Sequence, residues 1–118
     1  MKCGKGNGFA VNHPGVLAGL GFIHANGHKW IAVDDVAKAA QMSRRALHKA
    51  FVNKLGATPG EVLRNARVER AKRLLAETDY KLETVARMSG YQAACSFGLA
   101  FEKLTSMMPG EFRRAALL

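Results

Sequence analysis

The chain has 118 residues, enough for one compact domain or two very small lobes around a shared core. Its 18 Lys and Arg against 9 Asp and Glu give a formal charge of +9, and 48% of its residues are hydrophobic. This composition excludes a disordered basic tail. No apolar run reaches the roughly 18 residues of a membrane-spanning helix, and the N-terminus lacks the apolar segment of a signal peptide. The basic excess indicates a polyanionic partner, most often nucleic acid.

The two cysteines, Cys3 and Cys95, lie far apart in the sequence. They form neither a disulfide framework nor a metal-binding spacing, so we expect no metal, no cofactor and a reducing, cytoplasmic compartment. The sequence also contains no nucleophile–base pair and no carboxylate dyad. An enzyme, such as a fragment of a DNA-repair protein, is therefore the functional alternative with the least support.

The first elements in chain order are a leader and a helix. Residues 1–12 alternate Gly with polar residues without an apolar period, which predicts a flexible leader. From Pro14 an apolar stripe with helical spacing begins, and it comprises Val16, Leu17, Leu20 and Ile23. Asn26 and Gly27 end this helix. Trp30, in the loop that follows, is expected to pack against the domain.

Two further helices follow, separated by a three-residue turn. A short helix is predicted from Val33 to Ala40, and residues 41–43 form the turn. Ser43 is a favourable N-cap for the next helix, which Gly56 ends. The predicted buried side chains of that helix are Leu47, Ala50, Phe51 and Leu55.

The longest helix opens at a capping-box sequence, Thr58-Pro59-Gly60-Glu61, and extends to about Glu77. Three more helices are predicted after it: one from Leu82 to Ser89, one that buries Phe97, Ala100, Phe101 and Leu104, and a last one from Pro109 that carries Phe112 and Ala116. No segment alternates with the period of two that is typical of strands. The predicted fold class is therefore all-α, with about seven helices.

The chain contains an internal repeat. Pro59-Gly60-Glu61 recurs fifty residues later as Pro109-Gly110-Glu111, and Phe51 recurs as Phe101. Each copy consists of a short helix, a tight turn and a longer helix, which is the helix-turn-helix layout. Two helical hairpins packed for stability alone would leave the charge pattern unexplained. Residues 36–60 contain no acidic residue and have a net charge of +5, whereas residues 86–110 have a net charge of +1.

The basic segment places a row of side chains on one face of the helix that starts near Arg44. Arg45, His48, Lys49 and Val52 have the spacing i, i+3, i+4, i+7, opposite the apolar stripe. Arg and Lys side chains can donate to guanine O6 and N7, and His48 can donate to a base or a phosphate. Ser43 and Arg44 lie at the helix N-terminus, where phosphate contacts are favoured.

Taken together, these motifs resemble those of the AraC-type (AraC/XylS) transcription regulators over residues 14–115. The motifs that carry the resemblance are Met42-Ser43-x-x-x-Leu47-x-x-x-Phe51, Gly56-x-Thr58-Pro59, Leu63-x-x-x-Arg67-Val68-x-x-Ala71-x-x-Leu74-Leu75, Val85-Ala86-x-x-x-Gly90-Tyr91, Phe97-x-x-x-Phe101 and Pro109-Gly110-Glu111-Phe112-Arg113. The resemblance implies two homeodomain-like helix-turn-helix subdomains, 13–57 and 79–118, joined by a linker helix, 58–78. It also implies recognition helices in successive major-groove segments of double-stranded DNA, with base-contacting side chains at the positions of Arg45, His48 and Lys49.

The second recognition helix departs from the family pattern. The repeat aligns Arg45, His48, Lys49 and Val52 with Cys95, Gly98, Leu99 and Glu102. Leu99 stands where the family usually has a cation, and Glu102 repels phosphate. The remaining candidate contacts are Gln92, Cys95, Ser96 and apolar packing of Ala94 or Leu99 on thymine methyl groups. Thr105 and Ser106 replace a usual aromatic residue and glycine, so a less regular helix end is expected.

The sequence therefore predicts a sequence-specific DNA-binding transcription regulator in which the first subdomain dominates affinity. The alternative is an AraC-like module that binds DNA weakly and acts mainly through protein partners such as RNA polymerase. Arg113 is expected to pack against the domain or to neutralise a phosphate. Family members usually carry a separate sensor or dimerisation domain, and we expect any dimerisation to depend on such a domain outside this sequence.

Overall fold

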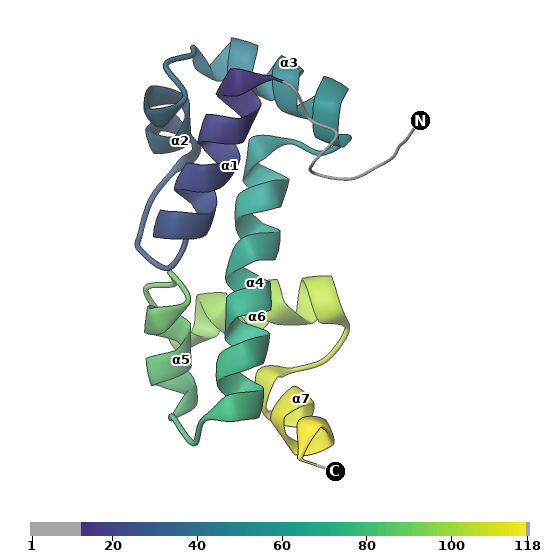
Figure 1. Cartoon of the computed structure of the whole chain (residues 1–118). Helices are drawn as coiled ribbons and strands as arrows, with labels where there is room; N and C mark the ends of the chain where they lie inside the picture. Colours follow the sequence, from purple (N-terminus) through teal and green to yellow (C-terminus); the bar gives the residue numbers. More distant parts are fainter. Residues whose placement is uncertain (1–12, 118) are drawn as a thin grey trace. The chain divides into compact units, whose positions relative to one another are not determined.

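The computed structural model describes residues 13–117, so the predicted leader, residues 1–12, lies outside the described residues (Figure 1). The described part of the chain is entirely helical and contains no strand, which confirms the predicted all-α fold. Its helices are α1 (Pro14–Asn26), α2 (Val33–Ala39), α3 (Arg44–Leu55), α4 (Pro59–Glu77), α5 (Leu82–Met88), α6 (Ala94–Thr105) and α7 (Pro109–Ala116). None of these helices is long and apolar enough to cross a membrane.

The chain divides into two compact units. Unit 1 comprises Ala32–Leu63 and the chain up to Ala25, and unit 2 comprises Asn26–Ile31 and Arg64–Leu118. Each unit contains one helix-turn-helix: α2 and α3 in unit 1, and α5 and α6 in unit 2. The long helix α4 contributes residues to both units, and the loop between α1 and α2 belongs to unit 2.

Unit 1 forms a core around Phe51 of α3. Its fully buried side chains include Val16, Ile23, Val36, Leu47 and Phe51. Gly19 lets α1 approach this core, because a Cβ atom there would lie 3.0 Å from Phe51 Cζ. Leu17, predicted in the apolar stripe, is instead 47% exposed, so that prediction was wrong. The buried side of α1 follows Val16, Gly19 and Ile23, and Leu17 lies off this stripe.

Side-chain caps fix the helix starts of unit 1 where the sequence predicts them. Ser43 Oγ accepts from the Ala46 amide at 3.1 Å and caps α3. The predicted capping box of α4 is present: Glu61 Oε1 accepts from the Thr58 amide at 2.8 Å, and Thr58 Oγ1 accepts from the Glu61 amide at 3.1 Å. His13 caps α1, because its Nδ1 accepts from the amides of Gly15 and Val16 at 3.1 and 3.2 Å.

Unit 2 has an aromatic core. The buried cluster comprises Val68, Ala71, Leu75, Val85, Ala86, Phe97 and Phe101. Neighbouring rings in the series Tyr91, Phe97, Phe101 and Phe112 have centroids 5.5 to 5.6 Å apart. Such tilted and edge-on ring pairs add stabilisation beyond the area they bury.

Three arginines of unit 2 donate to backbone carbonyl groups. Arg67 donates to the carbonyls of Gly27, Lys29 and Ile31 at 3.2, 3.3 and 2.8 Å. Arg70 donates to the Met88 carbonyl at 2.7 Å, and Arg113 donates to the Leu75 and Thr78 carbonyls at 3.1 and 3.2 Å. These bonds confirm that Arg113 packs against the domain, as predicted. They tie the loop 26–31 and the ends of α4 and α5 into unit 2.

Gly90 is required where this network is densest. Its φ of +95° is in the region that side chains disfavour, and a Cβ atom would lie 2.6 Å from the Gly27 carbonyl oxygen and 2.8 Å from Arg67 Nε. The loop 26–31 is thus held by its backbone. Trp30 is 74% exposed, so the prediction that it packs was wrong.

The end of α6 also differs from its prediction. Leu104 is 44% exposed instead of buried. It is equivalent in the repeat to Lys54, which lies on the exposed side of α3. Ala116 of α7 is exposed as well, because it lies in the last turn of that helix. The expected irregular end is absent: Ser106 adopts the left-handed conformation (φ 64°) that Gly56 adopts after α3 (φ 71°). Thr105 Oγ1 supports this turn, at 2.8 Å from the Phe101 carbonyl oxygen and 3.2 Å from the Met107 amide.

Candidate nucleic-acid interface

Helix α3 presents a basic face to solvent. Leu47 and Phe51 are fully buried on one side of the helix, which fixes its rotation. Arg45, His48 and Lys49 are exposed on the other side, and Val52 is 41% exposed beside them. The spacing of i, i+3 and i+4 makes the three polar side chains neighbours on the helix surface. This face combines guanidinium, imidazole and ammonium donors.

The start of α3 holds Ser43 and Arg44, which differ from this row. Ser43 Oγ already accepts the capping hydrogen bond, and its hydroxyl proton is available to an anion. Arg44 Nε lies 3.1 Å from Asp34 Oδ1 of α2, and both side chains are more than half exposed. An exposed ion pair of this kind contributes about 0–1 kcal/mol. It nevertheless directs Arg44 toward α2, a contact that the sequence did not indicate.

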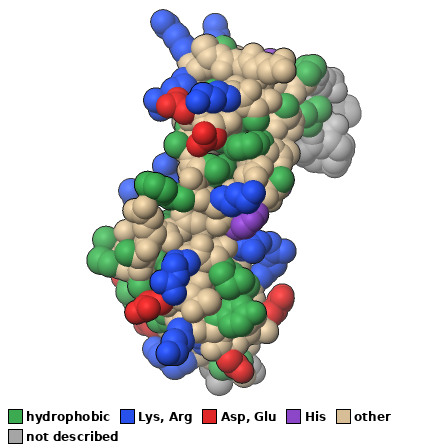
Figure 2. Space-filling model, turned by 90° about the vertical axis from the view of Figure 1, so that its left-hand side faces the viewer, with side chains coloured by type: hydrophobic (Ala, Val, Ile, Leu, Met, Phe, Trp, Pro, Cys, Tyr) green, Lys and Arg blue, Asp and Glu red, His purple; other side chains and the backbone are tan. Residues whose placement is uncertain are grey.

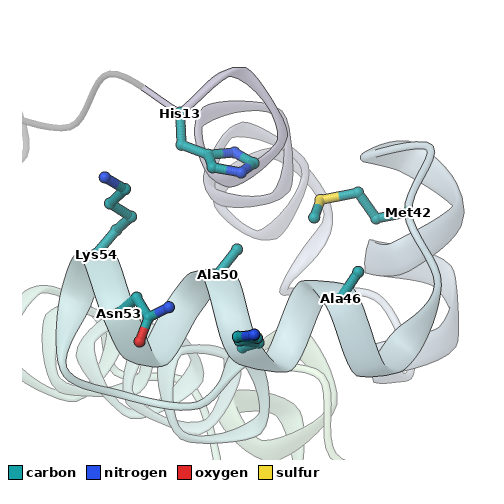
Figure 3. A pocket seen from close by; sticks show the side chains of 7 residues that line it. His13, Met42, Ala46, Ala50, Asn53 and Lys54 are labelled. Atoms are coloured by element: carbon teal, nitrogen blue, oxygen red, sulfur yellow. The ribbon is translucent and has the colours of Figure 1, made fainter.

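A pocket of about 300 Å³ lies beside this face, between the start of α1 and one side of α3 (Figure 3). The labelled side chains in Figure 3 show its composition: small Ala46 and Ala50 on α3, Met42 from the preceding turn and the His13 ring from the start of α1. Lys49 also lines it. The residues that line it include no carboxylate and no thiol.

Helix α6 presents a different face. Gln92, just before the helix, and Cys95, Ser96 and Leu99 on it are all exposed. Gly98, which the repeat aligns with the exposed His48, is buried, and a Cβ atom there would lie 3.6 Å from Met108 Cε. The repeat does not predict this role of Met108, because the equivalent residue in unit 1, Thr58, is a capping residue. The exposed side of α6 therefore lacks cations over most of its length.

The two units also differ in net charge. The described residues of unit 1 carry five Lys and Arg against three Asp and Glu, a net of +2, whereas those of unit 2 carry eleven against six, a net of +5. Three of the cations of unit 2 are the arginines that bond carbonyl groups in the fold. Lys and Arg side chains are interspersed with hydrophobic ones on the face shown in Figure 2.

Burial shifts the pKa of two partners in unit 2. Arg67 Cζ lies 5.9 Å from the centroid of the Tyr91 ring. Burial lowers the pKa of the Arg67 guanidinium, and the charge of Tyr91 opposes that shift. Burial raises the pKa of the Tyr91 hydroxyl, and the Arg67 and Arg64 guanidinium groups oppose this. These two side chains serve the packing of unit 2. Within residues 13–117, no group of three or more His, Cys, Asp or Glu is arranged to hold a metal ion.

The fold and this basic helix define a class, the helix-turn-helix domains. The helix-turn-helix domain family matches residues 36–115, and the chain belongs to it. More narrowly, it is an AraC-type domain, the DNA-binding domain of that class of transcription regulators.

Relatives in several bacteria share this type of domain. The chain is 35% identical over 92 residues to the lactose operon transcription activator of Staphylococcus xylosus, covering 78% of this chain and 33% of that protein. It is 33% identical over 102 residues to a putative AraC-like transcription regulator of Streptomyces antibioticus, covering 86% and 33%. The chain thus spans about a third of the length of these curated relatives.

Two solved structures share the fold. The DNA-binding domain of AdpA, a global transcriptional factor solved in complex with a target DNA, superposes with a TM-score of 0.81 at 27% identity, covering 88% of this chain and 93% of that one. The C-terminal domain of AraT, a response regulator from Geobacillus stearothermophilus, superposes with a TM-score of 0.83 at 25% identity, covering 86% and 85%.

Proposed function

We propose that this chain binds double-stranded DNA in a sequence-specific manner and acts as the DNA-binding part of a transcription regulator. The observation that carries the proposal is the exposed row of Arg45, His48 and Lys49 on α3, backed by the buried Leu47 and Phe51. A helix held in this way can enter a major groove with its donors toward the bases. The likeness to the DNA-bound AdpA domain supports the same conclusion.

Each side chain has a proposed role in this complex. Arg45 and Lys49 donate to guanine O6 and N7, and His48 donates to a base acceptor or a phosphate. Ser43 and Arg44 contact phosphates at the start of α3. The weaker set of contacts comes from Gln92, just before α6, and from the exposed Cys95, Ser96 and Leu99 on it. The division of the chain into subdomains 13–57 and 79–118 around the linker 58–78 belongs to the same proposal.

The role of Arg45 can be tested by selecting a duplex from a randomised pool and measuring its affinity at fixed salt. Arg45→Ala is expected to weaken binding by about 1–3 kcal/mol and to relax specificity at one base position, because a bidentate contact to guanine is lost. Arg73→Ala is the matched control, since it removes an exposed cation of the same kind from α4. This variant should lower the affinity for all DNA sequences to the same extent. Equal effects of the two variants on sequence preference would contradict base recognition by α3.

The salt dependence of affinity distinguishes this function from its alternative. A protein that neutralises several phosphates loses affinity steeply as salt rises, because counterions are released on binding. A module that acts mainly through protein partners such as RNA polymerase would show a shallow slope and no selected sequence. The exposed Leu99 and Trp30 are the observation that favours this second candidate.

The remaining parts of the proposal concern the whole protein. We infer a binding role without catalysis, action in the cytoplasm where bacterial DNA lies, and dimerisation, if any, through another domain. The part of the chain that matches these relatives covers 33% of their length, which supports a regulator with further domains.

A further inference from the structure

The exposed face of α6 is apolar at the position where α3 is basic. Leu99 is 66% exposed, the largest value for a large hydrophobic side chain within a described helix. Cys95, four residues earlier and therefore its neighbour on the helix surface, is also exposed. Ser96, the other neighbour on this surface, is small and uncharged. A partner that covers this exposed leucine removes apolar surface from water, which stabilises the complex.

The repeat assigns Leu99 to the position of Lys49. The two residues are fifty positions apart in the sequence, and both are exposed. Matching buried pairs fix the rotation of their helices: Leu47 with Phe51 on α3, and Phe97 with Phe101 on α6. Leu99 therefore projects from α6 as Lys49 projects from α3, each within its own unit. If α6 lies in a major groove, Leu99 faces the base edges.

The chemistry of the groove limits what Leu99 can contact. Its side chain has no hydrogen-bond donor or acceptor, and the one apolar group exposed on base edges in the major groove is the thymine C5-methyl group. Unit 2 also has the charge that a polyanion requires. Its net charge is +5, and its exposed cations are Lys29, Arg64, Arg73, Lys81, Arg87, Lys103 and Arg114. Its six acidic residues are exposed as well, and one of them, Glu102, lies on α6. A nucleic acid therefore fits this unit better than an apolar protein surface does.

We propose that Leu99 packs on thymine methyl groups and that α6 thereby selects thymine at one or two positions of its groove segment. This inference rests on the proposed function and goes beyond it, because it replaces the hydrogen-bonding recognition of α3 with methyl recognition in α6. Cys95 extends the same apolar surface by one helical turn.

Deoxyuridine provides the test, since it differs from thymidine only by the missing methyl group. In a duplex selected from a randomised pool, each thymidine is replaced singly by deoxyuridine, and binding of the full chain is measured by fluorescence anisotropy. One or two replacements should weaken binding about fourfold, the change that corresponds to burial of one methyl group. At those positions Leu99→Ala should bind the thymidine and deoxyuridine duplexes equally.

Two variants sharpen the result. Val52→Ala is the matched control, because Val52 is an exposed apolar residue of α3, and this variant should leave the Leu99-dependent positions sensitive. Leu99→Lys, which copies Lys49, should abolish the deoxyuridine effect and steepen the salt dependence. Thermal unfolding of the Leu99 variants should match that of the unmodified chain, since Leu99 is exposed.

The inference is overturned if a duplex is selected and bound but Leu99→Ala leaves every deoxyuridine effect unchanged, or if no thymidine is sensitive. Failure of the proposed function itself looks different. In that case no sequence is selected and the affinity for duplex DNA falls only with a shallow slope as salt rises.

Discussion

Neighbouring arginines of α3 have different surroundings, and this decides what each can do. Arg45 lies on the exposed face with His48, whereas Arg44 is held by Asp34 at 3.1 Å. Any phosphate contact of Arg44 must compete with that carboxylate. The ion pair is exposed, so it is weak, and a phosphate can displace Asp34 at a small cost.

Asp34→Asn should therefore increase DNA affinity, by up to about fivefold at low salt, since the competing pair contributes about 0–1 kcal/mol. The gain should shrink as salt is added, because exposed charges are screened. Titration of a selected duplex at two salt concentrations measures both effects. Asp79→Asn is the control, since it removes an exposed carboxylate that forms no ion pair within the described residues. An equal gain from Asp79→Asn would show that only net charge matters.

At the scale of the element, α3 and α6 end in the same way with different residues. The amide of Gly56 donates to the Val52 carbonyl, and the amide of Ser106 donates to the Glu102 carbonyl. Both capping residues have a positive φ, of 71° and 64°. Glycine adopts the left-handed conformation with little cost in free energy, whereas a residue with a Cβ atom is destabilised there by roughly 1 kcal/mol.

Ser106→Gly should accordingly raise the free energy of unfolding by about 0.5–1 kcal/mol, because it removes the strain at the end of α6. The matched change, Gly56→Ser, should lower it by a similar amount, since nothing lies within 4 Å of a Cβ atom there and only the backbone conformation is affected. Urea unfolding followed by circular dichroism gives both values. A destabilised Ser106→Gly variant would show that the Ser106 side chain has a stabilising role that outweighs strain.

Helix positions followed from the sequence because caps, glycines and apolar spacing act locally. Ser43 and the Thr58–Glu61 capping box are examples in which the structure matches the prediction. Contacts across long separations left no such pattern. Arg67 bonds a loop 36 to 40 residues earlier, and Met108 covers Gly98 from beyond the end of α6. The exposure of the basic face of α3 was predictable from its periodicity, but the ion pair of Arg44 was not.

For the whole molecule, the +9 charge separates into cations that hold the fold and cations that are free to meet a polyanion. Arg67, Arg70 and Arg113 belong to the first group, since each donates to backbone carbonyls. Charge counted from sequence windows does not reveal this division, because it treats every arginine alike. The phosphate-binding capacity of the chain is therefore smaller than its net charge suggests.

Arg113 and Arg114 test this division, because they are adjacent on α7 and carry the same charge. Arg113→Ala should lower the free energy of unfolding by about 1.5–3 kcal/mol, since the Leu75 and Thr78 carbonyls lose a charged donor. Arg114 is exposed, so Arg114→Ala should change stability by less than about 0.5 kcal/mol. Urea unfolding of both variants, with nonspecific duplex binding as a second measurement, separates the roles. If Arg114→Ala destabilised the chain as much as Arg113→Ala, the bonds to the Leu75 and Thr78 carbonyls would not account for the loss, and the division between structural and free cations would fail.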